Sequence, residues 1–309
     1  MQGLESKDYI IAIHQKKVAV QKKREIVYMD NNWIQDFKQV QIDMLKIFIK
    51  ICEEYDLKYY LIGGSCLGAV RHGGFIPWDD DIDVGMPRKD YDRFSKIAKK
   101  ELPTNLFFQT FLTDSEYPNI FGKLRNSDTT YIESSVKNLS INHGVYIDVF
   151  PLDIAPNNVL IRKSINILMK VYQISVSRCF DGRLTKSTSL FKNLGKKTIW
   201  ALLPNVKNSI IRRDKVARLF QSASCKYIAN YGGAWGEKEV MPCAVFGEGR
   251  KILFEGIEVL IPENYDEYLT RLYGDYMTPP PIEKQIGHHY YEIADMKKSY
   301  KEYTGGKQN

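Results

Sequence analysis

The segment 61–85, LIGGSCLGAVRHGGFIPWDDDIDVG, concentrates the residues that could do chemistry. Its acidic run ends with Asp81 and Asp83, which flank one apolar residue. Residues i and i+2 of a strand share a face, so these two carboxylates would point together. Two like charges held that close need a cation between them, and hard oxygen ligands suit Mg²⁺ or Mn²⁺. A third carboxylate, Asp148, lies in a later apolar segment and could complete the metal site or act as a base.

Groups that could hold a phosphate lie close to this acidic run in the sequence. Gly63, Gly64 and Ser65 form a predicted turn whose bare backbone N–H groups could cradle a phosphate. Arg71 and His72 lie between this turn and the carboxylates, where we expect them to meet a phosphate. Together with the acids, these residues predict a metal-dependent, phosphate-handling active site.

Each of these groups also has a simpler interpretation. An acidic run is commonly a solvated loop, Arg71 and His72 would then be a surface pair, and Asp148 alone could be a satisfied core acid. Lys123 and Arg125 alternate on one strand face, and the sequence leaves a surface position and a second phosphate contact equally open. An EF-hand is excluded, because its calcium loop needs glycine at the sixth position and glutamate at the twelfth, and the acidic run has neither.

Composition indicates an ordinary globular protein. The 309 residues are 44% hydrophobic and 26% charged, which is enough for an ample core and does not suggest disorder.

The net charge of +7 is unevenly placed, because the segment 161–226 holds 15 Lys and Arg but only two acids. This basic segment could be a solvated helical subdomain, a nucleic-acid binder or a membrane-surface element. No nucleic-acid motif is present, and apolar stripes beside Lys and Arg favour contact with an anionic membrane surface.

The cysteines and the apolar runs predict a location for the protein. The five cysteines are widely spaced and lack a C-x-x-C motif, so we expect no disulfide framework and a reducing compartment. The N-terminal segment lacks the apolar core of a signal peptide, and no apolar run reaches the roughly 18 residues that could span a bilayer. The sequence therefore predicts a cytoplasmic protein, which could lie at the inner face of the membrane.

Helices and strands alternate irregularly around the candidate residues, which predicts an α/β or α+β fold with a mixed sheet. The predicted helices cover 32–54, 65–71, 87–101 and 264–272. The helix 264–272 is predicted to be the last of the chain, and Gly274 closes it. Two further helical stretches lie within 157–226, and the second of them spans 191–203. The predicted strands cover 57–62, 82–86, 106–111, 120–124, 129–133, 145–150 ending at Pro151, and a hairpin of 252–254 with 257–261 turned at Glu255-Gly256.

The segment LGAVRHGGFIPWDDDIDVGM resembles the signature of the LicD family, which includes the fukutin-type transferases. The segments GVYIDVFPLD and YGDYMTPPP resemble later blocks of that family, so the resemblance covers roughly residues 35–155 and 240–290. It implies a nucleotidyltransferase-like fold and a Mg²⁺-dependent transfer of phosphocholine, or a similar phospho-alcohol, from a CDP-linked donor. The acceptor would be a sugar hydroxyl on a cell-surface glycan or teichoic acid precursor, for which we expect a lipid-linked form, and CMP would leave.

The resemblance also implies roles for particular residues. Asp81 and Asp83 would be metal ligands, with Asp148 as the third acid of the catalytic site. The predicted donor-binding residues are Gly64, Ser65, Arg71, His72, Lys123, Arg125, Tyr273, Asp275 and His288.

The predicted organisation has four parts: an N-terminal extension (1–30), a nucleotidyltransferase-like catalytic core (31–156), a basic helical insert for the acceptor or membrane surface (157–226), and a part completing the core and donor pocket (227–309). Two other functions stay open on the sequence. One is a nucleotidyltransferase that attaches NMP to a small molecule and releases pyrophosphate. The other is a non-catalytic module that binds a membrane or a glycan.

Overall fold

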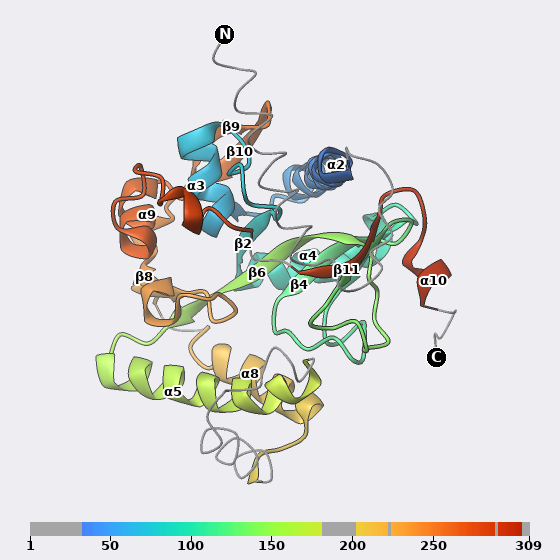
Figure 1. Ribbon diagram of the computed structural model, residues 1–309. Helices are drawn as coiled ribbons and strands as arrows, with labels where there is room; N and C mark the ends of the chain where they lie inside the picture. The colour runs from blue at the N-terminus through green and yellow to red at the C-terminus, as the bar shows by residue number, and fades with distance from the viewer. Residues whose placement is uncertain (1–32, 181–201, 222–223, 288–289, 305–309) are drawn as a thin grey trace.

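A mixed β-sheet forms the centre of the computed structural model, which describes residues 33–180, 202–221, 224–287 and 290–304 (Figure 1). Its strands run in the order β1-β2-β6-β4-β3, and β7 joins β6 to β8. Only β2 and β6 of this sheet pair in parallel in the described part of the chain. The strand bounds are β1 Tyr60–Leu61, β2 Asp83–Pro87, β3 Leu106–Gln109, β4 Gly122–Asn126, β6 Val145–Ala155, β7 Tyr227–Ala229 and β8 Val240–Pro242. The predicted α+β class is confirmed.

Two helices build the core around this sheet. Helix α2 (Trp33–Glu54) and helix α4 (Arg88–Glu101) meet where the rings of Phe48 and Phe94 lie 4.9 Å apart. A Cβ on Gly122 of β4 would lie 2.4 Å from the ring of Phe108, which itself packs on Phe94 of α4. Because side chains alternate along a strand, α4 covers the face opposite to that of Lys123.

The C-terminal elements pack into the same core. Helix α3 (Gly63–His72) contacts β9 (Arg250–Phe254) and α9 (Tyr265–Tyr273). Strand β9 forms a hairpin with β10 (Ile257–Ile261), turned by Glu255 and Gly256 with φ of 50° and 77°. Two central residues with positive φ are the signature of a type I′ turn, so the predicted hairpin is confirmed.

Strand β6 is longer than predicted and passes through Pro151. The N–H of Asp148 points to β2, because it donates to the Ile82 carbonyl at 2.8 Å, so the nitrogen of Pro151 points to the opposite side. On that side the pairing with β4 ends at Val149, and the pairing with β7 begins at Asp153. Pro151 therefore lies where no ladder hydrogen bond is needed, and the prediction that it ends the strand is wrong.

Several other boundaries differ from the predictions. Strand β1 holds two residues of the predicted segment 57–62, and β5 (Thr130–Glu133) pairs outside the central sheet with β11 (Tyr291–Asp295). The sequence pattern did not predict β11, and α10 (Tyr300–Tyr303) follows α9, which is therefore not the final helix.

The basic insert contributes two helices that pack on each other beside the sheet (Figure 1). Helix α5 (Val159–Val176) and helix α8 (Val206–Ala217) share a small core that includes Ile165, Met169 and Ile210. The predicted helical stretch 191–203 lies almost entirely outside the described residues, as does the predicted extension 1–30. Among the described helices, none combines the length and the apolar character needed to cross a bilayer.

A buried ion-pair network joins the insert to the core. Arg88 of α4 donates from Nε and Nη2 to the Asp153 carboxylate at 2.7 and 2.8 Å, and from Nη1 to Asp214 of α8 at 3.2 Å. Arg218, just after α8, binds Asp92 of α4 at 2.6 Å and Asp214 at 2.6 Å. Asp214, an acid within the basic insert, is thus used to hold the insert against α4.

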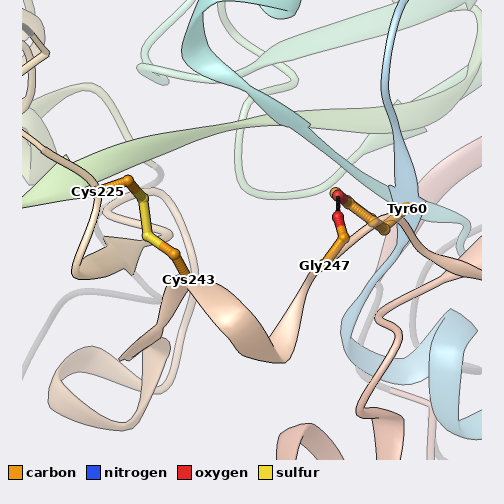
Figure 2. The surroundings of a disulfide bond; sticks show 4 residues. All are labelled: Tyr60, Cys225, Cys243 and Gly247. Carbon is orange, nitrogen blue, oxygen red and sulfur yellow. Dashed lines mark hydrogen bonds between the residues drawn. A yellow bond between two sulfur atoms is a disulfide. The ribbon is translucent and has the colours of Figure 1, made fainter.

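A disulfide links Cys225 to Cys243, whose Cα atoms lie 6.1 Å apart (Figure 2). The sequence predicted no disulfide framework, and this one pair departs from that expectation. The pairing of β7 with β8 brings them together, since the N–H of Cys243 donates to the Lys226 carbonyl at 3.1 Å. Figure 2 also shows the nearby bond from the Tyr60 hydroxyl to the Gly247 carbonyl, 2.7 Å long.

Replacing Arg88 tests the network that holds the insert. Arg88→Met would leave the carboxylates of Asp153 and Asp214 buried with too few partners, so we expect a loss of about 3–5 kcal/mol in the free energy of unfolding, measured in urea. Lys89→Met removes a positive charge from the next, exposed position and should change that free energy by less than about 1 kcal/mol. Equal effects of the two variants would contradict a stabilising role for the network.

Candidate active site

Three charged side chains form a row across the central sheet. Asp83 on β2 is the register partner of Asp148 on β6, which in turn is the partner of Lys123 on β4. Register partners on neighbouring strands point to the same face, so the three side chains lie side by side. The Lys123 ammonium lies 3.3 Å from Oδ1 of Asp148. The sheet thus brings two of the predicted acids together and sets a cation beside one of them.

The N-terminus of α3 meets this row. A Cβ on Gly63 would lie 2.9 Å from Oδ2 of Asp83, and a Cβ on Gly64 would lie 2.6 Å from Oδ2 of Asp79. Gly63 also has a φ of +55°, which favours glycine. Bare backbone at both positions therefore lets the positive end of the helix approach the carboxylates. The same end of a helix can bind a phosphate.

Ser65 has a different place from the predicted one. The predicted glycine-serine turn is the first turn of α3, and Ile62, not Ser65, is the N-cap residue. Oγ of the buried Ser65 accepts a hydrogen bond from the N–H of Asp83 at 2.8 Å. Ser65 thus fixes the start of β2 relative to α3, and so positions the Asp83 carboxylate.

Two tyrosines of α9 close this side of the site. The N–H of Gly63 donates to the hydroxyl of buried Tyr268 at 2.9 Å. Burial raises the pKa of the Tyr273 hydroxyl, and the nearby charges of Asp83 and Asp79 raise it further. Tyr273, predicted as a donor-pocket residue, is therefore close enough to these carboxylates for their charge to act on its hydroxyl. Tyr268 was missed, because nothing in the sequence distinguishes it from the other tyrosines.

The acidic run is half-buried, which argues against a solvated loop. Burial lowers the pKa of Lys38 on α2, and the charges of Asp80, Asp79, Glu255 and Asp81 oppose that shift. The Tyr131 hydroxyl lies 3.4 Å from Oδ2 of Asp80. Lys38 was not predicted as a site residue, since only the fold brings α2 to the acidic run.

Arg125 and Lys123, which alternate on β4, have different surroundings. Arg125 is completely buried and donates to Gln109 at 2.8 Å, to the Gly144 carbonyl at 2.7 Å and to Glu133 at 3.4 Å. Lys123 lies 3.5 Å from the same carboxylate of Glu133 as well as 3.3 Å from Asp148. Arg125 therefore holds Glu133 from within the core, while Lys123 lies beside Asp148 in the row.

The remaining predicted residues lie away from the carboxylates or outside the described chain. Arg71 and His72 occupy the opposite end of α3, where Nη1 of Arg71 donates to the Tyr276 carbonyl at 2.7 Å. Burial lowers the pKa of both side chains, and the Arg71 charge lowers that of His72 further. Oδ1 of exposed Asp275 accepts from the N–H of Thr278 at 3.3 Å, and His288 lies outside the described residues.

The donor atoms of the row fit a hard divalent cation. Asp83 and Asp148 offer only carboxylate oxygens, which Mg²⁺ and Mn²⁺ prefer. Within the described ranges, no three His, Cys, Asp or Glu side chains are grouped closely enough to hold a metal ion. The arrangement would therefore bind a cation through two carboxylates and leave further positions for water or the oxygens of a phosphate.

Gly64→Ala tests whether the bare helix end is needed. The new Cβ would displace the Asp79 carboxylate and cover the N-terminus of α3, so we expect the binding of CDP in the presence of Mg²⁺, measured by calorimetry, to weaken about tenfold or more. The free energy of unfolding should change by no more than about 1 kcal/mol, since alanine has a higher helix propensity than glycine. Unchanged CDP binding in a folded variant would contradict the assignment of this helix end.

Comparisons with known proteins identify the family of this chain. Residues 56–177 match the family model described as LicD/FKTN/FKRP, nucleotidyltransferase domain, and this range includes Asp83, Lys123 and Asp148. The chain is 32% identical over 262 residues to the lipopolysaccharide cholinephosphotransferase LicD of Haemophilus influenzae, covering 82% of this chain and 94% of that protein.

More distant relatives match shorter segments. The human ribitol 5-phosphate transferase FKRP is 29% identical over 84 residues, which are 27% of this chain and 17% of FKRP. The mouse ribitol-5-phosphate transferase FKTN is 30% identical over 66 residues, which are 21% of this chain and 14% of FKTN. All three relatives are named as transferases of a phosphorylated alcohol. The similarity to the first covers nearly its whole length, and the chain therefore belongs to the LicD family, as its motifs predicted.

Proposed function

We propose that the chain transfers phosphocholine, or a similar phospho-alcohol, from a CDP-linked donor to a sugar hydroxyl of a cell-surface glycan or teichoic acid precursor. The relative of nearly equal length is named as a cholinephosphotransferase acting on lipopolysaccharide, and the shorter matches are ribitol phosphate transferases. The observation that carries the proposal is the register of Asp83 with Asp148 at the N-terminus of α3. This register would place a site for a cation beside a site for a phosphate.

The proposed reaction is a phosphoryl displacement. The oxygen of the acceptor hydroxyl attacks the phosphorus that carries the alcohol, and the bond from that phosphorus to the oxygen of CMP breaks. The products are the phosphodiester of the sugar, CMP and a proton. Such a displacement depends mainly on positioning and on neutralising charge at the attacking and leaving oxygens.

The side chains around the row divide this work. The backbone N–H groups at the start of α3 would bind a donor phosphate, and Tyr268 and Ser65 keep that helix end and Asp83 in place. Asp83 and Asp148, with Asp81 close by in sequence, would hold Mg²⁺, which when bound supplies positive charge against the phosphate oxygens. Asp148 is also the candidate acceptor of the hydroxyl proton.

Lys123 and Glu133 would tune Asp148. The Lys123 ammonium lies between the carboxylates of Asp148 and Glu133, at 3.3 and 3.5 Å, and 3.1 Å from the centroid of the Tyr146 ring. A cation so placed offsets part of the negative charge of Asp148 before the nucleotide binds. Arg125 fixes the far side of Glu133, so the position of Lys123 is set by the core.

The outer face of α5 fits the proposed contact with an anionic membrane surface. Leu160, Ile161 and Ile167 are exposed apolar side chains, and the exposed Lys163 and Lys170 belong to the same helix. Apolar and cationic side chains on one surface helix suit the boundary between headgroups and acyl chains. At such a surface the protein would contact a lipid-linked acceptor.

Substitution of the paired carboxylates tests the proposal. With CDP-choline, Mg²⁺ and a glycan acceptor, Asp83→Asn and Asp148→Asn should each lower CMP release by about 100-fold or more, because each loses a ligand or a base. Asp43→Asn, which alters an exposed carboxylate of α2, should release CMP at the wild-type rate. Full activity of Asp83→Asn at saturating Mg²⁺ would contradict the assignment. Release of pyrophosphate from a nucleoside triphosphate would instead support a nucleotidyltransferase.

A further inference from the structure

A cavity of about 390 Å³ lies between the basic insert and the core. Helix α5 forms one wall with Asn166, Lys170 and Gln173, and α8 contributes Arg213. The opposite walls are the segment 119–121, just before β4, and the glycine-rich loop 230–236, which follows β7. The cavity thus joins the insert, whose role is open, to the sheet that carries the active site.

A pair of phenylalanines connects the cavity to the strand that carries Asp148. The rings of Phe121 and Phe150 lie 4.3 Å apart, and a Cβ on Gly232 would lie 3.0 Å from Phe121 and 3.1 Å from Phe150. Phe150 follows Asp148 by two residues on β6, so the two side chains share a face about 7 Å apart along the strand. Phe121 lines the cavity, so the cavity and Asp148 are connected through the stacked rings of Phe121 and Phe150.

Arg213 is a buried cation in the wall of this cavity. Its residue is only 7% exposed, and its guanidinium donates to the amide oxygen of Gln173 and, at 3.5 Å, to the Tyr231 carbonyl. Its Nε has no hydrogen-bond partner in the described part of the chain, and no described carboxylate forms an ion pair with it. Burial alone lowers the pKa of Arg213 to about 10.

The contrast with two nearby arginines shows what Arg213 lacks. Arg88 and Arg218 each face two or more carboxylates, which offset the cost of removing a guanidinium from water. Arg213 has only neutral oxygens, and none of the described residues that line the cavity is Asp or Glu. A buried charge left without a counterion destabilises the free protein, so an anionic ligand is the expected counterpart.

The other lining side chains suit a sugar. Asn119, Asn166 and Gln173 can each donate and accept hydrogen bonds, as sugar hydroxyls also do. Phe121 and Tyr231 add flat apolar surfaces. Together with Arg213, they favour a hydroxyl-rich ligand that carries a negative charge.

We propose that this cavity binds a phosphate-bearing sugar of the acceptor, with its phosphate on Arg213 and Lys170 and a hydroxyl directed to the row of Asp83 and Asp148. This inference rests on the proposed function and narrows the acceptor to an anionic glycan. It also gives the basic insert a role in acceptor recognition.

Calorimetric titration of the full chain with glucose 1-phosphate tests the cavity, with glucose and inorganic phosphate as comparison ligands. Glucose 1-phosphate should bind the wild type more tightly than either comparison ligand. Arg213→Met should weaken this binding at least about tenfold, because a charged hydrogen bond is lost. Arg212→Met removes the neighbouring exposed charge of α8 and should leave binding within about twofold.

Two further measurements separate this site from the donor site. CDP-choline with Mg²⁺ should bind Arg213→Met as it binds the wild type, and the melting temperature of the ligand-free variant should equal or exceed that of the wild type. Equal loss of CDP-choline binding in Arg213→Met would assign the anion to the donor and overturn the inference. Absence of glucose 1-phosphate binding to a wild type that binds CDP-choline would also overturn it, while the proposed function would stand.

A second variant covers the case in which Arg213→Met fails to fold. Lys170 is exposed at the rim of the cavity, so Lys170→Met should fold normally and weaken glucose 1-phosphate binding by about threefold or more. Wild-type affinity in Lys170→Met would then contradict the inference. If the wild type binds glucose 1-phosphate but not CDP-choline, the proposed function fails and the cavity remains an anionic-sugar site.

Discussion

The parallel pairing of β2 with β6 sets two carboxylates side by side, and much of the surrounding structure offsets their repulsion. Two unit charges about 5 Å apart repel by about 3 kcal/mol at an effective dielectric constant near 20. Lys123 lies 3.3 Å from Asp148 on one side, and the positive end of α3 meets Asp83 on the other. Both compensating groups are held by buried contacts, through Glu133 and through Tyr268. The negative charge of the site is therefore kept in place before any ligand arrives.

Strand β6 connects this charge to the basic insert. Along β6, Asp148 is followed by Phe150 on the same face and then by Asp153 on the opposite face, where Asp153 binds Arg88 of α4. Arg88 and Arg218 bind α8 to α4, which fixes the helix that carries Arg213. A single strand thus aligns the carboxylate row, the wall of the cavity and the attachment of the insert. These ion pairs hold the insert against the core, which suits a part that would present an acceptor.

Local patterns in the sequence predicted the features that depend on residues close together in the chain. The apolar periodicity of α2, the Glu255-Gly256 turn and the α+β class are confirmed. Long-range pairing decided the rest. The register of Asp83 with Asp148 and the pairing of β5 with β11 join residues too far apart for spacing to reveal. The role of Arg125 was open because alternation shows a face of a strand, and not what covers that face. The contacts of Tyr268 and Arg213 likewise exist only in the folded chain.

The central claim is that the paired carboxylates and the N-terminus of α3 form one site for the metal-bound diphosphate of a CDP-linked donor. Thermal unfolding of the full chain with CDP-choline, CDP-ribitol and CDP-glycerol, each with and without Mg²⁺, tests it most directly. We expect at least one of these donors to raise the melting temperature strongly only when Mg²⁺ is present, and Asp83→Asn with Asp148→Asn to abolish that rise. A rise that is independent of Mg²⁺, or that persists in the double variant, would contradict the claim.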